Sequence, residues 1–478
     1  MQIEEKLSYD DVLLVPRYSE VLPHMVDVST RLTNSIKLNV PVLSAAMDTV
    51  TEEKMAIALA RQGGAGVIHR NLSPEEQARQ VGHVKRYLNW VIEDPITVDA
   101  HQTVAEVEKI MMSQGVTGLP VLDKGRLVGI ITNRDMRFCK NGEQPVTELM
   151  TTDLVVERGT PTSETAAEKF YKHRIEKLPV VDENFHLTGL ITVSDMEKKA
   201  KYPNAATDAH GRLIVGAAVS PNDLDKRIPL LIENKCDFVV LDAAHGVSKN
   251  VLDAIKYIKD NWDIQVIGGN VIDEDGTERV IKAGADAVKV GVGPGSICTT
   301  RIVAGIGVPQ FSAVMDAARC AKKYNIPVIA DGGIKFSGDI VKAIGAGASA
   351  IMVGNLFAGL KESPGKEIIF EGRIFKSYRG MGSVGAIKKG GGDRYNMKEG
   401  DEPVPEGIEG RVPYKGEMAP YLNQLVTGLK KGMGYTGNGT IKELNEYQKF
   451  IRISGAGLTE SHAHDIAITQ EAPNYSRF

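Results

Sequence analysis

A glycine-rich stretch, GVGPGSICTTRIVAGIGVPQ (291–310), surrounds Cys298, one of only four cysteines in the chain. A free cysteine is most often a small, buried, apolar residue. Here the flanking GPGS and TTR segments are unsuited to a core and are typical of an exposed loop. Backbone amides of such a loop stabilise a thiolate, which is the nucleophilic form of cysteine. The sequence therefore predicts a nucleophilic cysteine in a loop.

Eight short apolar runs end in small or polar residues, as expected of parallel strands buried on both faces. Amphipathic segments between them, such as 248–260, 275–286 and 337–349, predict helices. This order predicts an α/β fold, a (β/α)8 TIM barrel with its active site at the carboxyl ends of the strands. An open doubly wound sheet is the alternative. Gly-Gly at strand ends favours the barrel, because bare backbone can approach a phosphate there. The runs are 40–48, 64–69, 213–219, 238–246, 264–270, 287–293, 327–333 and 350–355.

A repeated unit interrupts this series after the second run. GVTGLPVLDKGRLVGIITNRDM (115–136) returns as RIEKLPVVDENFHLTGLITVSDM (174–196), each copy preceded by an amphipathic helix. A repeated unit that cannot bury its own apolar face implies a paired module. An α+β module is therefore predicted at 91–200, which splits the barrel into residues 1–90 and 201–478.

Composition indicates an enzyme of the cell interior. Charged residues make up 25% and hydrophobic residues 42%, and the net charge is −4 without a basic block, which argues against a nucleic-acid partner. No apolar run is long enough for a membrane helix, and the N-terminal MQIEEKLSYDD is too acidic for a signal peptide. The cysteines form no CxxC pair, which is typical of the reducing cytoplasm.

A long segment after the eighth strand, residues 385–416, is rich in glycine, proline and charge and has no sustained period. Such a segment in a compact protein is usually a lid or a disordered loop. We expect it to be a mobile flap.

Taken together, these motifs resemble the inosine-5′-monophosphate (IMP) dehydrogenase family. Residues 291–310 are similar to its catalytic loop. LSYDDVLLVP, SAAMDTVTE, ADGGI, SYRGMGSVGA, DRY, PEGIEGRVPYKG and SGAGLTESHAHD match in order across essentially the whole chain. The inserted repeat resembles a tandem cystathionine-β-synthase-type (CBS) pair. The resemblance implies NAD-dependent oxidation of IMP to xanthosine 5′-monophosphate, the committed step of guanine nucleotide synthesis.

The resemblance also implies covalent chemistry. Cys298 is expected to attack carbon 2 of the hypoxanthine ring, after which a hydride passes to NAD and water hydrolyses the thioimidate. Arg394 and Tyr395 of the DRY motif match an arginine–tyrosine pair whose arginine is proposed to activate that water. Thr300 matches a threonine that helps to orient the water, and Glu406 matches a flap residue that meets the purine edge.

Binding residues follow from the same match. For NAD, the expected residues are Asp242, Asn270, Gly291 and Gly293, although Asp242 could equally be a helix N-cap. Position 355 departs from the family pattern, in which serine is common, but the amide of asparagine can still donate to phosphate. For IMP, the phosphate is expected on Ser296, Gly333, Gly354 and Tyr378, the ribose hydroxyls on Asp331, and the base on Met381 and Gly382. The other residues expected to bind IMP are Met47, Gly332 and Asn355.

Family members often bind K⁺ between subunits, which implies an oligomer here, a homotetramer or an octamer. The two histidines near the C-terminus are a weak signal for a transition metal. The expected K⁺ ligands are carbonyl groups of Gly293, Gly295 and Cys298, together with Glu460, Ser461 and His462 of a neighbouring subunit.

In the inserted module, Thr132/Asp135 and Thr192/Asp195 fit the G-h-h-T-x-x-D pattern, where h is apolar, that often contacts a nucleotide. Adenine or guanine nucleotides are therefore expected there as regulators, and a purely structural pair is the alternative.

Two other functions remain open. GMP reductase has the same barrel, cysteine and phosphate site, but catalyses an NADPH-dependent reductive deamination and hydrolyses no adduct. The DRY and EGIEGRVPYKG motifs therefore favour the dehydrogenase. A non-catalytic nucleotide sensor is opposed by the presence of the cysteine, threonine, arginine and tyrosine that the chemistry needs.

Overall fold

The computed structural model describes residues 3–475, except 89, 94, 160, 392–403, 471 and 473. The chain divides into two compact units. One consists of Met1–Tyr87, Asn204–Asp208 and Leu213–Phe478, and the other of Leu88–Pro203 and Ala209–Arg212. The second unit overlaps the module that the sequence predicts at 91–200.

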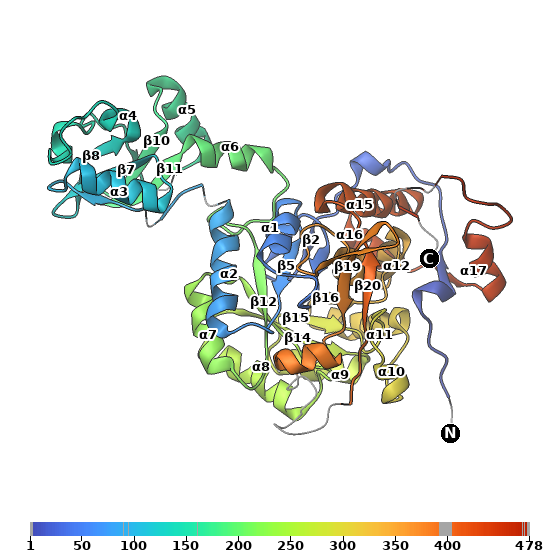
Figure 1. The fold of residues 1–478 in the computed structure, drawn as a ribbon. Helices are drawn as coiled ribbons and strands as arrows, with labels where there is room; N and C mark the ends of the chain where they lie inside the picture. The colour runs from blue at the N-terminus through green and yellow to red at the C-terminus, as the bar shows by residue number, and fades with distance from the viewer. Residues whose placement is uncertain are drawn as a thin grey trace. The chain divides into compact units, whose positions relative to one another are not determined.

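Eight parallel strands close into a barrel in the first unit (Figure 1). Each strand overlaps one of the eight predicted apolar runs. This closure confirms the predicted TIM barrel and excludes the open doubly wound sheet. Around the barrel, the strands are β12 (Val215–Val219), β13 (Phe238–Leu241), β14 (Gln265–Val271), β15 (Ala287–Val290), β16 (Val328–Asp331), β17 (Ala350–Val353), β4 (Val42–Ser44) and β5 (Ala65–Ile68).

Amphipathic helices alternate with these strands. In α8 the residues Val251, Ala254, Ile255 and Ile258 are all buried, and their spacing of three and four places them on one face of the helix. The predicted helices at 248–260, 275–286 and 337–349 correspond to α8, α9 and α12. The helices are α1 (Glu53–Arg61), α2 (Pro74–Tyr87), α7 (Leu224–Glu233), α8 (Lys249–Asn261), α9 (Glu274–Lys282), α11 (Gln310–Lys323) and α12 (Ser337–Gly345).

Apolar side chains fill the barrel interior. Phe238 on β13 is fully buried in a cluster that also contains Leu43, Ile267 and Ile329. Gly216 on β12 makes room for it, because a Cβ there would lie 2.2 Å from the Phe238 ring. The interior is thus a packed core, and ligand chemistry is confined to the barrel ends.

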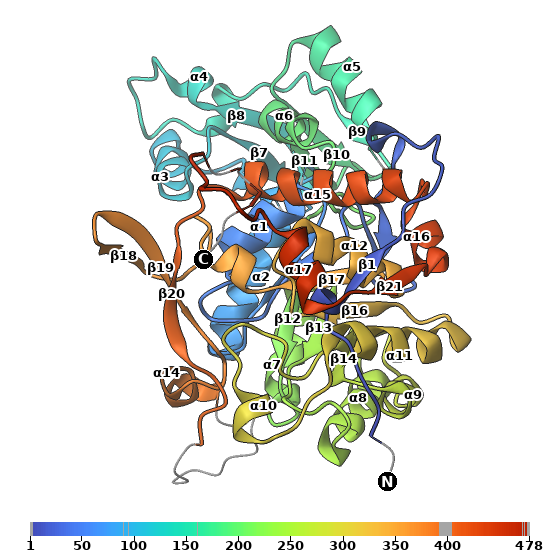
Figure 2. The same ribbon diagram turned by 90° about the vertical axis from the view of Figure 1, so that its right-hand side faces the viewer.

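A three-stranded antiparallel sheet lies outside the barrel and contains β18 (Glu367–Phe370), β19 (Arg373–Arg379) and β20 (Glu409–Pro413) (Figure 2). β20 lies within 385–416, so the expectation of a continuous loop there is wrong for 409–413. The segment also begins with ordered helical turns, α14 (Val384–Ala386) and the π-helix η4 (Ile387–Gly391). These elements are too short to show a period, and β20 obtains its hydrogen bonds from β19, which is distant in sequence.

The second unit has two halves with the same order of elements, and each half has its own apolar cluster. The first half consists of β6 (Val98–Asp99), α3 (Val104–Gln114), β7 (Gly118–Asp123), β8 (Arg126–Thr132) and α4 (Asn133–Met136). The second consists of β9 (Glu157–Arg158), α5 (Ser163–His173), β10 (Lys177–Val181), β11 (Leu187–Thr192) and α6 (Val193–Lys201).

The two threonine–aspartate pairs of this unit close the starts of α4 and α6. Thr132 Oγ1 donates to Asp135 Oδ2 at 2.7 Å, and Thr192 Oγ1 donates to Asp195 Oδ2 at 2.6 Å. Asp135 Oδ2 also accepts from Thr132 N–H at 2.8 Å, and Thr192 Oγ1 accepts from Asp195 N–H at 3.2 Å, so each pair acts as a helix cap in this structure. Among the described residues, no helix is long and apolar enough to cross a membrane.

Candidate active site

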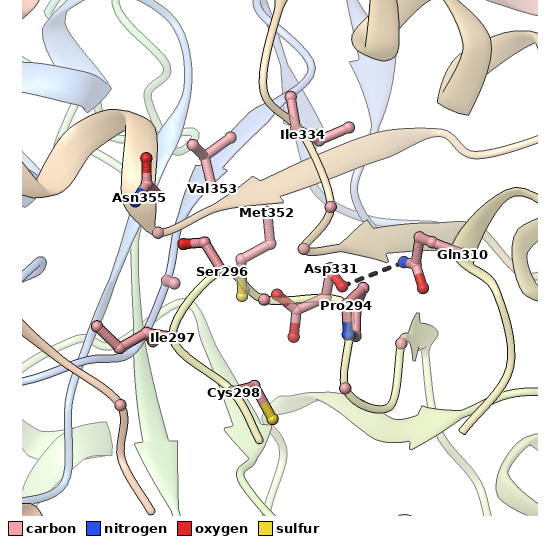
Figure 3. Close-up of a pocket in the computed structure, with 18 of the residues that line it drawn as sticks. Pro294, Ser296, Ile297, Cys298, Gln310, Asp331, Ile334, Met352, Val353 and Asn355 are labelled. Carbon is pink, nitrogen blue, oxygen red and sulfur yellow. Dashed lines mark hydrogen bonds between the residues drawn. The ribbon is translucent and has the colours of Figure 1, made fainter. Parts of the chain in front are cut away.

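A cavity of about 360 Å³ lies at the carboxyl ends of the barrel strands (Figure 3). Its walls come from the segments that follow β4, β13, β14, β15, β16 and β17, and from β19 and the residues after it. Volumes of this order are typical of small-molecule sites. The cavity brings together residues that are more than 300 positions apart in sequence, such as Met47 and Tyr378.

Cys298 lies in the loop between β15 and α11 and lines this cavity (Figure 3). Its side chain is half-buried, whereas Cys236 and Cys320 are buried in the barrel. Burial raises the pKa of Cys236 to about 12, which keeps that thiol protonated and unreactive. The interpretation of Cys298 as a core residue is therefore wrong, and its thiol is open to a ligand.

Two polar side chains form a short chain with the Cys298 thiol. Its Sγ lies 3.2 Å from Thr300 Oγ1, and Thr300 Oγ1 donates to Glu406 Oε2 at 2.7 Å. Because the threonine hydrogen points to the carboxylate, the hydroxyl oxygen is free to accept from the thiol or from a water molecule. Glu406 and Cys298 line the cavity. Thr300 is not part of the lining, but it contacts the Cys298 thiol that is.

The backbone holds Glu406 beside the cysteine loop. Thr299 N–H donates to the Glu406 carbonyl at 2.9 Å, and Ile408 N–H donates to the Ile297 carbonyl at 3.0 Å. Cys298 and Gly407 are paired as an antiparallel bridge. Residues 406–408 are therefore held against the cysteine loop, and Glu406 among them lines the cavity.

Glycine backbone and two hydroxyl groups form the end of the cavity where the sequence predicts phosphate. Gly332 and Gly333 have φ of +89° and +80°, which side-chain-bearing residues rarely adopt. Burial raises the pKa of Tyr378, and a hydrogen bond with Ser296 offsets only part of this effect. Its hydroxyl therefore stays protonated and can donate to an anion. Gly354 lies against this hydroxyl, since a Cβ there would be 3.1 Å from Tyr378 Oη.

A buried lysine that the sequence analysis missed, Lys289, contacts both Asn270, which is expected to bind NAD, and Asp331, which is expected to bind IMP. Lys289 on β15 is 2% exposed, and its Nζ donates to Asp331 Oδ2 at 2.6 Å and to Asn270 Oδ1. Asn270 Nδ2 also donates to Asp331 Oδ2, at 2.9 Å, and to the Gly291 carbonyl, at 2.6 Å. These donors converge on Oδ2, so Oδ1 is the atom that a ribose hydroxyl would meet. The signal for Lys289 in the sequence was that it is the one charged residue within the apolar run AVKV.

Asp242 follows β13, is buried, and lines the cavity. Its carboxylate lies 3.8 Å from Arg70 Nε. The interpretation of Asp242 as a helix N-cap is wrong, because α8 begins seven residues later at Lys249.

Most of the other predicted ligand-binding residues also line the cavity, and a few lie elsewhere. Arg394 and Tyr395 are outside the described residues. Glu460, Ser461 and His462, which the resemblance assigns to a neighbouring subunit's site, do not line the cavity of their own chain. The remaining predicted residues that line the cavity are Met47, Gly291, Gly293, Gly295, Asn355, Met381 and Gly382.

The C-terminal residues are held within their own chain. His462 follows α17 (Gly455–Ser461), and its Nδ1 lies 3.0 Å from Tyr475 Oη while its ring packs against Phe336. Within the described part of the chain, no three His, Cys, Asp or Glu side chains gather as metal ligands. A K⁺ site here would therefore rest on carbonyl oxygens, which the loop of Gly293 and Gly295 offers.

Comparison with known proteins gives consistent relatives over the full length. Curated inosine-5′-monophosphate dehydrogenases of Aquifex aeolicus, Halalkalibacterium halodurans and Bacillus subtilis are 56%, 54% and 51% identical to this chain. In each case the match covers 99% of this chain and 98% of the relative.

Among solved structures, a crystal structure of a cysteine-to-alanine variant of GMP reductase from Trypanosoma brucei, in complex with guanosine 5′-monophosphate, is similar. It has a TM-score of 0.86 and 40% identity, and the match covers 97% of this chain and 99% of that chain. The family model described as the IMP dehydrogenase / GMP reductase domain matches residues 6–464. The chain therefore belongs to the IMP dehydrogenase / GMP reductase family.

Proposed function

We propose that this chain oxidises IMP to xanthosine 5′-monophosphate by means of a covalent adduct on Cys298. The chain is an NAD-dependent IMP dehydrogenase, in line with relatives of that name at 51–56% identity over nearly its full length. The observation that carries the covalent mechanism is the position of the Cys298 thiol, which faces a nucleotide-sized cavity and contacts Thr300 at 3.2 Å.

In the first half of the reaction, the thiolate attacks the electron-poor carbon between the two ring nitrogens of the hypoxanthine. Ser296, Tyr378 and the glycine backbone would hold the phosphate, and Asp331 Oδ1 would hold the ribose hydroxyls. The adduct is then a hydride donor. NAD, when bound beside Asp242 and Asn270, supplies the hydride acceptor.

In the second half, water must reach the same carbon. Thr300 is suited to orient it, because its hydrogen is committed to Glu406 and its oxygen can accept. Arg394 and Tyr395 are assigned the removal of the water proton, by their match to the family motif. An arginine is a demanding base, because its free guanidinium has a pKa above 12.

K⁺ and an assembly complete the proposal. The carbonyl groups of Gly293, Gly295 and Cys298 would bind K⁺ together with a neighbouring subunit's C-terminal segment, in a homotetramer or an octamer. The tight turn of the loop, with Gly293 at φ +77°, supports this because a turn can direct successive carbonyl groups toward one point. A cytoplasmic location is proposed as well, supported by four free cysteines.

The alternative activity is that of a GMP reductase, and the observation that supports it is the 40% identical structure of that name. One experiment separates the two. Wild-type protein mixed with IMP and NAD should form NADH, whereas GMP and NADPH should give no turnover. Cys298→Ala should abolish NADH formation, and mass spectrometry of wild-type protein quenched during turnover should find a purine nucleotide on Cys298. Full activity of the alanine variant would refute the covalent mechanism.

Arg394→Ala should separate the two half-reactions. Because the arginine is assigned to hydrolysis alone, the rapid first turnover of NADH should persist, while steady-state turnover falls by about 10²–10⁴-fold. Stopped-flow absorbance measures both phases. Arg373→Ala, at an exposed position on β19, is the control and should change neither. An unchanged steady-state rate in Arg394→Ala would remove Arg394 from the mechanism.

Lys289→Met should weaken IMP binding. The Asp331 carboxylate loses the ammonium that orients it, so we expect KM for IMP to rise by about 10-fold or more, equivalent to about 1.4 kcal/mol. Lys289→Arg should recover part of the loss. Lys85→Met removes a lysine buried to a similar degree, paired with Asp237 away from the cavity, and should leave KM unchanged. Equal KM values in Lys289→Met and wild type would show that Lys289 has no part in substrate binding.

For the inserted module, we propose regulation by adenine or guanine nucleotides. Isothermal titration of the full chain with ATP and with GTP should give saturable heat, which Asp135→Asn together with Asp195→Asn should abolish. If wild-type protein gives no heat with either nucleotide, the two pairs act only as the helix caps seen at α4 and α6.

A further inference from the structure

A buried ion pair lies next to the cavity but outside its lining. Arg379, the last residue of β19, donates from Nε to Asp48 Oδ1 at 3.0 Å and from Nη2 to Asp48 Oδ2. The Asp48 side chain is 7% exposed and that of Arg379 is 16% exposed. Two parallel bonds between a planar guanidinium and a carboxylate fix orientation as well as distance.

The residues that precede Asp48 and Arg379 in sequence both face the cavity. Met47 and Tyr378 line the cavity, and Met47 Sδ lies 3.9 Å from Tyr378 Oη. Successive side chains on a strand point to opposite faces, so Arg379 points away from the cavity when Tyr378 points into it. The same two chain segments are therefore joined twice, by Met47 and Tyr378 inside the cavity and by the ion pair behind its wall.

The backbone adds to this connection. Arg379 N–H donates to Thr49 Oγ1 at 3.3 Å. The residues after Arg379 are Gly380, Met381 and Gly382, and all three line the cavity. The loop expected to meet the purine base is thus attached, at its first residue, to the segment after β4.

The pair also contacts the start of the segment that leads to the DRY motif. Asn71 Nδ2 donates to Asp48 Oδ2 at 3.2 Å and to the Ala386 carbonyl at 3.4 Å. Gly385 packs so closely that a Cβ on it would lie 2.8 Å from Arg379 Nη1. The ion pair is therefore the point at which the segment after β4, the end of β19 and α14 meet.

Charge strengthens the pair. Burial alone would raise the pKa of Asp48, but the hydrogen bonds and charge of Arg379 outweigh this and lower it. The carboxylate therefore stays ionised at neutral pH, and both bonds to the guanidinium are maintained.

We propose that Asp48 and Arg379 are positioning residues for the purine. They hold Tyr378 and the loop Gly380–Gly382 at the distance from Met47 that IMP requires, without touching the ligand. NAD is expected at Asp242 and Asn270, whereas Tyr378 and the loop Gly380–Gly382 are expected to meet IMP. The ion pair should therefore control the affinity for IMP much more than that for NAD.

The test is the effect of Asp48→Asn on the two Michaelis constants. We expect KM for IMP to rise by about 10-fold or more, as a loss of about 1.4 kcal/mol of binding would give, and KM for NAD to stay within about 3-fold. Arg379→Lys, which keeps the charge but offers a point donor in place of the fork, should fall between Asp48→Asn and wild type.

Asp237→Asn is the matched control. Asp237 is also buried in an ion pair, with Lys85 at 2.8 Å, but it lies at the opposite ends of the strands, next to the N-terminus of β12. It should lower the midpoint of thermal unfolding without changing KM for IMP. If Asp48→Asn behaves in the same way, the pair is merely structural and the proposal is wrong. If Asp48→Asn does not fold, Arg379→Lys decides, and an unchanged KM for IMP in that variant would overturn the proposal.

Discussion

One buried ammonium group, that of Lys289, organises the centre of this site. It stands on β15 between Asn270 of β14 and Asp331 of β16, and it donates to both. An isolated charge at this depth would be costly, whereas a paired and hydrogen-bonded one is tolerated. The closed barrel makes the pairing possible, since only neighbouring parallel strands bring these three side chains to the same end. The Asp331 carboxylate, which we propose binds the ribose, is thereby held in one orientation.

This arrangement also bears on the phosphate binding that we propose for the cavity. The charge of Lys289 is matched by Asp331, so neither is available to the anion at the far end. The cavity still offers backbone at Gly332, Gly333 and Gly354 and a Tyr378 hydroxyl that burial keeps protonated, and the cationic side chains of Arg301 and Lys335 also line it. Oriented backbone dipoles can hold an anion in such a site. Backbone dipoles and the Tyr378 hydroxyl would therefore contribute to the phosphate binding that we propose, together with these cations.

Sequence predicted the barrel because each strand is an uninterrupted apolar run, and it predicted the cysteine loop because its composition excludes a core. It did not reveal Lys289, which looks like an exception within an apolar strand until its partners on the two adjacent strands are seen. The Asp48–Arg379 pair was missed for a similar reason, since its members are 331 positions apart. β20 was missed because its hydrogen bonds come from β19. The local sequence pattern thus predicts whether a segment is a strand, a helix or a loop. Which charged side chains are paired depends instead on contacts between residues that are distant in sequence.

The described residues of the expected flap bear on how both of the proposed half-reactions would take place in one cavity. Residues 406–408 are bonded to the cysteine loop through Thr299 and Ile297, and 409–413 are paired with β19. These residues are therefore joined both to the cysteine loop and to β19, and separating them from the loop would break several backbone bonds together. In the mechanism that we propose, nicotinamide would be exchanged for water while these backbone bonds stay intact. The bond between Thr300 and Glu406 would then orient the threonine oxygen before water arrives.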